Sequence, residues 1–173
     1  MPEIELTVAS LPERNVIENM MQFYVHDFSE FWWDRDDGDL EADGRFAPYP
    51  LDPYWSSPHH TPLLARTAGR LVGFALVNSE GHGGAPVDRN VAEFFIARKY
   101  RRGGYGTAVV HGLFDRWPGH WEAAVARRNV GARAFWRRAV VSHPRVSQIE
   151  EHDVTSAHWN GPILRFRIGE ATA

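Results

Sequence analysis

The sequence predicts an α/β protein with a mixed central β-sheet of about six to seven strands and helices on both faces. Strand-like patterns dominate the first half of the chain, two strand–helix pairs alternate in the second half, and two further strands close it. Successive strands favour antiparallel pairing, whereas strand–helix alternation is typical of parallel pairing. Because the 173 residues contain no internal repeat and no linker, we expect a single domain over residues 1–173.

The first half begins with a strand, where Ile4, Leu6 and Val8 alternate with polar residues. Ser10 is a suitable N-cap for a helix that follows. Residues 29–60 are rich in aspartate, proline and aromatic residues, and they predict a loop with at most a short helical turn. The apolar residues of the helix recur at helical spacing: Val16, Ile17, Met20, Met21, Tyr24 and Phe28.

The remaining elements are predicted from apolar runs and from the glycine and proline residues that separate them. Pro118 and Gly119 stop the first of two later helices. In chain order we expect a hairpin of Leu63–Arg66 and Arg70–Asn78, a glycine-rich connection over 81–90, a strand over Val91–Arg98, a helix over Gly104–Trp117, a strand over Trp121–Ala126, a helix from Asn129 to about Val141, and strands near Val146–Glu150 and Ile163–Ile168.

Charge is divided unevenly along the chain. Residues 1–88 carry 15 acids against 5 arginines, whereas residues 89–145 carry 3 acids against 12 basic residues. This division favours an anionic ligand for the middle of the chain and a cationic one for the first half. The alternative is a pair of solvated faces that hold each other by weak ion pairs. Nucleic acid is not expected as a partner, because the basic residues occupy a glycine-rich turn and two short helices without a recognition motif.

Composition excludes several other kinds of site. The chain has no cysteine, which rules out disulfides, thiolate metal sites and a cysteine nucleophile. Its nine histidines show no metal-ligand spacing beside a carboxylate, so no metal is expected. An acidic N-terminus and the lack of an apolar run of about 18 residues predict a cytoplasmic protein with no membrane segment.

The most informative segment joins the apolar strand to the glycine-rich turn over Arg101–Thr107 and to the helix after it. Glycine lets the backbone approach a ligand closely, and the N-terminus of a helix attracts negative charge. Arginine adds a rigid fork of donors that suits phosphate. The segment therefore predicts a site for a phosphate-bearing ligand.

This segment resembles the acetyl-CoA-binding signature of the GNAT superfamily of N-acetyltransferases. The order of elements agrees with that superfamily, and residues 23–33 are similar to poorly characterised bacterial members. The resemblance implies the GNAT fold with acetyl-CoA as co-substrate, an acetyl-CoA-binding core at about 89–141 and an acceptor-side region at about 10–60. It rests on two motifs, Arg101-x-x-Gly104-x-Gly106 and Asn129-x-x-Ala132-x-x-Phe135-Trp136.

The same resemblance implies which residues would hold acetyl-CoA. The backbone of the strand would pair with the pantetheine arm like an added strand, and the turn would bind the pyrophosphate. Asn129 would contact the pantetheine arm, although it is also a good N-cap, and Phe135 has the spacing of a core residue. The implied contacts are Ile96, Ala97, Arg98, Arg101, Arg102, Gly103, Gly104, Tyr105, Gly106, Thr107, Asn129, Phe135 and Trp136.

Glu93 is the candidate catalytic residue. It interrupts the apolar strand just before the implied pantetheine segment, and some family members have a catalytic glutamate at a similar position. As a general base it would take a proton from the attacking amine. The alternative is that it faces water or pairs with an arginine. Many family members place a tyrosine on the late helix to protonate the departing thiolate, but Trp136 stands there in this chain, and an indole N–H cannot act as an acid.

The stretch Asp27–Asp43 combines acids with aromatic residues, which suits a cationic amine through Coulomb attraction and cation–π contact. In the family, the first helices and the following loop border the acceptor site. The alternative is a solvated loop whose tryptophans fill the core. The candidate acceptor contacts are Tyr24, Asp27, Glu30, Trp32 and Trp33.

Together, these features predict an N-acetyltransferase that transfers the acetyl group of acetyl-CoA directly to a primary amine of a small, cationic substrate. Polyamine-like, amino-sugar and amino-acid-derived amines all fit this description. A catalytically weak or inactive acyl-CoA-binding module with a regulatory role is the alternative, which the missing tyrosine favours. The sequence allows a homodimer without specifying its interface.

Overall fold

The computed structural model describes residues 1–32 and 38–171. Within these residues, seven strands form one sheet in the order β1-β2-β3-β4-β5-β7-β6. Neighbouring strands are antiparallel except for β4 and β5, which are parallel. The predicted mixed sheet is confirmed.

The elements lie close to their predicted positions in the chain. The strands are β1 (Glu5–Val8), β2 (Thr61–Thr67), β3 (Arg70–Asn78), β4 (Arg89–Ile96), β5 (Gly119–Ala124), β6 (Val146–Thr155) and β7 (Asn160–Ile168). The helices are α1 (Arg14–Ser29), α2 (Pro53–Ser56), α3 (Tyr105–Arg116) and α4 (Val130–Val141), and short 3-10 turns cover Leu11–Glu13 and Arg98–Tyr100.

Several strand boundaries differ from the prediction. Strand β4 ends at Ile96 rather than Arg98, because the chain turns there and the N–H of Tyr100 bonds to the carbonyl of Ala97. Strands β6 and β7 are longer than predicted. Most of β6 is exposed at the edge of the sheet, and most of its residues are polar. The alternation of apolar and polar residues that indicates a half-buried strand is therefore too weak to predict its full length.

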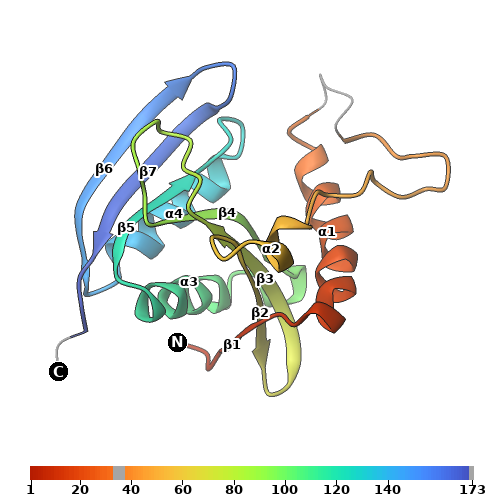
Figure 1. The fold of residues 1–173 in the computed structure, drawn as a ribbon, viewed down its shortest axis with the longest axis horizontal. Coiled ribbons are helices and arrows are strands. Elements are labelled where there is room, and N and C mark those ends of the chain that lie inside the picture. The colour runs from red at the N-terminus through yellow and green to blue at the C-terminus, as the bar shows by residue number, and fades with distance from the viewer. Residues whose placement is uncertain (33–37, 172–173) are drawn as a thin grey trace.

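Helices cover both faces of the sheet, as predicted, with α1 on one side and α3 on the other (Figure 1). On the first face, Ile17 and Met21 of α1 pack with Phe74 of β3. On the second face, Phe114 of α3 and Trp121 of β5 are fully buried, with ring centroids 5.3 Å apart. No helix in the described part of the chain combines the length and the apolar character needed to cross a membrane.

Candidate active site

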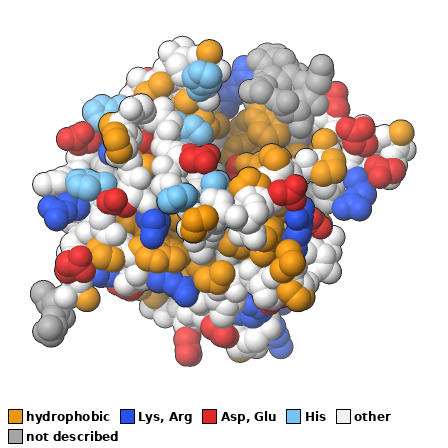
Figure 2. All heavy atoms as spheres, in the orientation of Figure 1, with side chains coloured by type: hydrophobic (Ala, Val, Ile, Leu, Met, Phe, Trp, Pro, Cys, Tyr) orange, Lys and Arg blue, Asp and Glu red, His pale blue; other side chains and the backbone are white. Residues whose placement is uncertain are grey.

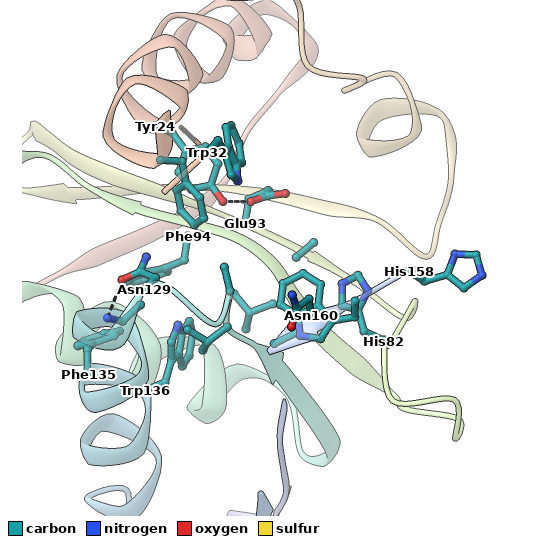
Figure 3. Close-up of a pocket in the computed structure, with 18 of the residues that line it drawn as sticks. Tyr24, Trp32, His82, Glu93, Phe94, Asn129, Phe135, Trp136, His158 and Asn160 are labelled. Atoms are coloured by element: carbon teal, nitrogen blue, oxygen red, sulfur yellow. Dashed lines mark hydrogen bonds between the residues drawn. The ribbon is translucent and has the colours of Figure 1, made fainter. Parts of the chain in front are cut away.

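A pocket opens where β4 and β5 separate. These strands pair only at Arg89 with Trp121 and at Asn90 with Glu122, and beyond these pairs the ladder stops. A pocket of about 480 Å³ lies there, between the middle of β4 and the end of β5, with α1 and α4 contributing to its walls. It appears as a hollow with hydrophobic side chains inside it (Figure 2), and the residues around it are drawn in Figure 3.

Glu93 lies on the wall of this pocket (Figure 3). One carboxylate oxygen, Oε2, accepts a hydrogen bond from the hydroxyl of Tyr24 on α1, and the other, Oε1, accepts one from the hydroxyl of Tyr49. Burial raises the pKa of the Glu93 carboxyl above its ordinary value, although both hydrogen bonds favour the charged form. A carboxylate with a raised pKa is better matched to proton transfer near neutral pH than an ordinary glutamate.

Tyr49 is a site residue that the sequence did not indicate. It lies in the irregular segment between α1 and α2, where no periodic pattern assigns it to a surface. The folded chain brings it to Glu93, which is 44 residues further along the sequence. Burial and the charge on Glu93 both raise the pKa of Tyr49, so its hydroxyl stays protonated and remains a donor.

Asn129 caps α4, and it also lines the pocket. Its side-chain Oδ1 accepts a hydrogen bond of 2.9 Å from the N–H of Ala132 (Figure 3). The N-cap interpretation is therefore confirmed, and it leaves the side-chain amide able to contact a ligand. Phe135 and Trp136 also line the pocket, where Phe135 stacks on Phe94 with ring centroids 5.6 Å apart. Trp136 is only 6% exposed, so it is a core residue as well.

The glycine-rich turn leads directly into α3, as predicted, and lies outside the lining of the pocket. Gly104 has a φ angle of 82°, in the left-handed region that glycine adopts without strain. The first intrahelical bond runs from the N–H of Ala108 to the carbonyl of Gly104, so the helix itself does not use the preceding N–H groups. These groups belong to Tyr105, Gly106 and Thr107, and they can bind an anion.

Other turn residues have packing or conformational roles. A Cβ atom on Gly106 would lie 3.1 Å from the ring of Phe135, so this glycine also allows α3 to approach α4. A Cβ atom on Gly103 would lie 3.2 Å from the ring of Tyr105. Arg102 is exposed, with a φ angle of 63°. The turn is thus shaped by local packing as well as suited to a phosphate.

Two arginines expected to contact acetyl-CoA meet an acid expected to contact the acceptor. Arg98 donates a hydrogen bond of 2.9 Å to Oδ1 of Asp27, and Arg101 donates to Oδ2 of the same carboxylate. Burial alone would raise the pKa of Asp27, but the hydrogen bonds and charges of the two arginines hold it below its ordinary value. Asp27 therefore joins α1 to the segment before the glycine-rich turn instead of facing the pocket.

The strand end predicted to hold the pantetheine arm is already engaged within the protein. The carbonyl of Ile96 accepts a hydrogen bond of 2.7 Å from Nε of Arg101, and the N–H of Ala97 bonds to the carbonyl of Val72 at 2.8 Å. The part of β4 that lines the pocket is Val91–Phe94, which lies nearer the N-terminus of the strand than predicted.

On the acceptor side, Tyr24 and Trp32 line the pocket, together with Phe28. Glu30 is exposed at the end of α1 and does not contribute to the lining. Trp33 lies outside the described residues. Within the described part of the chain, this wall is therefore aromatic rather than acidic. No group of histidines and acids in the described residues is arranged to hold a metal ion.

Another wall comes from two loops that the sequence did not indicate as part of the site. His82, after β3, stacks on Trp159, before β7, with ring centroids 4.6 Å apart. The fully buried carboxylate of Glu122 accepts hydrogen bonds from the backbone N–H groups of His82 and Gly83. It also accepts two bonds of 3.0 Å from Arg165 on β7. In the sequence, the only indication of this anchored loop was Glu122 itself, an acid inside the otherwise apolar strand β5.

Parallel strands that separate after two residue pairs leave main-chain N–H and C=O groups of β4 open to an extended ligand. The N-terminus of α3 offers an anion site beyond the end of that strand. This is the architecture of an acyl-CoA-dependent acyltransferase.

The model of the acetyltransferase (GNAT) family matches residues 17–140. The chain therefore belongs to the GNAT family of acetyltransferases, in which acetyl-CoA is the acetyl donor. A mycothiol acetyltransferase from Amycolatopsis mediterranei (strain U-32) is 30% identical over 135 residues, which are 76% of this chain and 43% of the relative. The chain thus spans less than half the length of this curated relative.

Solved structures with the same fold include an aminoglycoside acetyltransferase AAC(6')-Ib in complex with coenzyme A and kanamycin. It has a TM-score of 0.60 and 16% identity, and the match covers 96% of this chain and 95% of that one. The putative acetyltransferase yncA from Salmonella typhimurium, with acetyl-CoA, has a TM-score of 0.59 and 14% identity, covering 99% and 97% of the two chains. These similarities support the GNAT fold.

Proposed function

We propose that this chain transfers the acetyl group of acetyl-CoA directly to the primary amine of a small, cationic substrate. The observation that carries this proposal is the carboxylate of Glu93, held by two tyrosines in the pocket where β4 and β5 separate. Acetyl-CoA supplies an activated thioester. The open edge of β4, Asn129 and the N–H groups before Ala108 would hold it, with Arg102 adding positive charge.

Glu93 would act as the general base. A lysine-like amine has a pKa of about 10.4, so at pH 7 roughly one molecule in 2,500 is neutral and nucleophilic, a deficit of about 4.6 kcal/mol. A carboxylate in the pocket can take the proton as the amine attacks the thioester carbonyl, which lowers this deficit in the transition state. The raised pKa of Glu93 makes it a stronger base than an ordinary glutamate.

The pocket also has features that suit a cation. An ammonium group is attracted to the carboxylate of Glu93 and to the faces of Phe28 and Trp32 on the neighbouring wall. Because Asp27 is paired with arginines and Glu30 is exposed, the acidic stretch Asp27–Asp43 supports this proposal less directly than the pocket itself.

The test is release of free CoA thiol from acetyl-CoA across polyamines, aminoglycosides, amino acids and lysine peptides, with Glu93→Gln measured in parallel. We expect turnover with one amine class. Glu93→Gln should lose 10-fold or more in kcat with unchanged acetyl-CoA affinity, because a general base contributes about 10²–10⁴-fold to the rate. Glu170→Gln, an exposed acid near the end of the chain, is the matched control.

Three results would separate the alternatives. Turnover that Glu93→Gln abolishes supports the proposal and names the substrate class. Acetyl-CoA binding without turnover on any amine favours the acyl-CoA-binding module. No binding of acetyl-CoA contradicts both. For the active amine, KM should rise between low and high ionic strength, because salt screens its attraction to the carboxylate.

The pH profile gives an independent check on Glu93. A general base works only when deprotonated, so kcat/KM should fall as pH decreases through the pKa of Glu93. Because burial raises that pKa, the fall should occur at a higher pH than for an ordinary glutamate, whose pKa is about 4.3. In Glu93→Gln this acidic limb should disappear. An unchanged profile would remove Glu93 from the mechanism.

A further inference from the structure

The two tyrosines on Glu93 contact different oxygens of the carboxylate and border different spaces. Tyr24, which donates to Oε2, lines the pocket between β4 and β5. Tyr49, which donates to Oε1, lines a separate pocket of about 340 Å³ between α1 and residues 41–51. Both side chains therefore hold the same carboxylate, but Tyr24 alone of the two borders the space proposed for the reaction.

The proposed reaction needs a proton donor as well as a base. The sulfur of acetyl-CoA leaves as a thiolate, and α4 presents Phe135 and Trp136 to the pocket. A phenyl ring has no proton to give, and an indole N–H does not act as an acid. A tyrosine hydroxyl is both a donor and an acid, and Tyr24 presents one beside Glu93 (Figure 3).

We propose that Tyr24 is a second catalytic residue, which donates a proton to the departing sulfur and regains it from Glu93, and that Tyr49 is a positioning residue that fixes Glu93. This proposal rests on the proposed function. It gives the two hydroxyls on one carboxylate separate tasks, according to the space that each side chain borders.

The charges explain how Tyr24 becomes an acid at the right stage. Burial and the negative charge of Glu93 raise the pKa of Tyr24 well above its ordinary value, so it stays protonated while Glu93 is charged. When Glu93 takes a proton from the amine, that charge is neutralised, and the phenol releases its own proton more readily. Among the described residues, burial and the charge of Glu93 also raise the pKa values of Tyr49 and of Tyr54 on α2.

The steps balance without another reactant. The neutral amine nitrogen attacks the thioester carbonyl carbon, a C–N bond forms and the C–S bond breaks, and the electron pair of that bond leaves on sulfur. The amine proton moves to Glu93, the phenolic proton of Tyr24 moves to sulfur, and the proton on Glu93 moves to the phenolate oxygen. The products are an N-acetyl amide and the free CoA thiol, with both residues restored. Passing a proton from glutamic acid, whose ordinary pKa is about 4.3, through Tyr24 to a thiolate is favourable, because the ordinary pKa of a thiol is about 8.5.

Tyr24→Phe and Tyr49→Phe form a matched pair, because each removes one hydroxyl from Glu93 and keeps the ring. The first measurement needs no ligand: titration of the Glu93 carboxyl by infrared or carbon NMR spectroscopy. Each variant should raise the pKa of Glu93, because each removes a donor that stabilises the charged form. Thermal melting of both variants checks that the fold is intact.

The second measurement is kcat with acetyl-CoA and with an analogue that carries fluorine next to the sulfur, which makes the leaving thiol more acidic. Tyr24→Phe should lower kcat with acetyl-CoA by about 10²-fold or more. The analogue should restore much of this loss, because a more acidic thiol leaves without a donor. Tyr49→Phe should lose less activity, through the altered pKa of Glu93, and should gain no more from the analogue than the wild type does.

Equal losses in the two variants, with no rescue of Tyr24→Phe by the analogue, would overturn the acid role of Tyr24 while leaving the acetyltransferase function intact. If the wild type binds acetyl-CoA but acetylates no amine, the proposed function fails, and the role of Tyr24 fails with it.

Discussion

Asp27 of α1 and Arg101 of the segment before α3 form an ion pair that joins the two sides of the site. Arg98 contacts the same carboxylate at 2.9 Å. Tyr24 lies three residues before Asp27, so both side chains project from one face of α1. That face therefore contacts both the carboxylate of Glu93 and the arginines of the segment before α3. The position of the proposed catalytic groups is coupled to the segment that would hold the pyrophosphate.

Asp27→Asn should tighten acetyl-CoA binding. The substitution removes a negative charge beside an anion site and frees two arginines to meet the pyrophosphate. Partly exposed ion pairs of this kind are worth about 0.2–1 kcal/mol, so the gain should be about 1.5- to 5-fold at low salt and should shrink at high salt. Calorimetric titration at two ionic strengths measures it.

Asp153→Asn is the control for this substitution, because Asp153 is paired with Arg127 on the β6 side of the molecule. It should leave acetyl-CoA affinity unchanged. Weaker binding in Asp27→Asn would show instead that the carboxylate holds the arginines in the geometry that the ligand needs.

Asn129 has one observed interaction and one proposed interaction, which two substitutions can separate. Its Oδ1 caps α4 through the N–H of Ala132. Asn129→Ala should cost about 1 kcal/mol of folding stability, whereas Asn129→Ser should keep the cap and most of the stability. If the side-chain amide also binds the pantetheine arm, both variants should raise KM for acetyl-CoA by about 2- to 10-fold, the usual effect of one lost hydrogen bond. A normal KM in Asn129→Ser would leave only the capping role.

The parts of the site that the sequence could predict depend on local patterns. The glycine turn, the cap at Asn129 and the carboxylate of Glu93 each stand out against their immediate neighbours, and each lies in the predicted element. Tyr49 does not stand out, because nothing in an irregular segment indicates which side chain will turn towards a distant strand. The ion pairs of Asp27 could not be predicted for a similar reason, since its arginine partners are more than 70 residues away in the sequence.

The second buried carboxylate makes a stability prediction. Glu122 is 0% exposed and is held by Arg165 and by the backbone of the loop that contains His82. Arg165→Met would leave this carboxylate buried without its cation, at a cost of about 3–5 kcal/mol in the free energy of unfolding. Glu122→Gln combined with Arg165→Met should recover part of that loss, because no unpaired charge remains.

Denaturant unfolding of the single and double variants measures this difference, and double-mutant analysis isolates the pairwise contribution. The amine KM should rise in Arg165→Met, because the loop carrying His82 loses its anchor while the glycine-rich turn is unaffected. If the losses in Glu122→Gln and in Arg165→Met add up to the loss in the double variant, the pair contributes no specific stabilisation.

His143 should make the protein less stable as the solution is acidified. It is 4% exposed, with Nε2 3.2 Å from Oδ1 of Asp115 and its ring 4.9 Å from the ring of His111. Burial lowers the pKa of His143 below its ordinary value of 6.5, with Asp115 opposing the shift and the charges of His111 and Arg145 adding to it. The unfolded chain therefore binds the proton more readily than the folded protein.

The contribution of His143 to stability is thus fully present above about pH 6.5, the unfolded value, and is lost as pH falls towards the lowered pKa of the folded state. The pKa of Asp115 is also below its ordinary value, so its contribution is lost only at more acidic pH. Unfolding free energy measured from pH 7.5 to 5.5 should fall in the wild type and in His120→Gln, whose histidine is exposed. In His143→Gln the starting stability should be lower, but the slope over this range should be reduced. An identical slope in His143→Gln would assign the acid sensitivity to other groups.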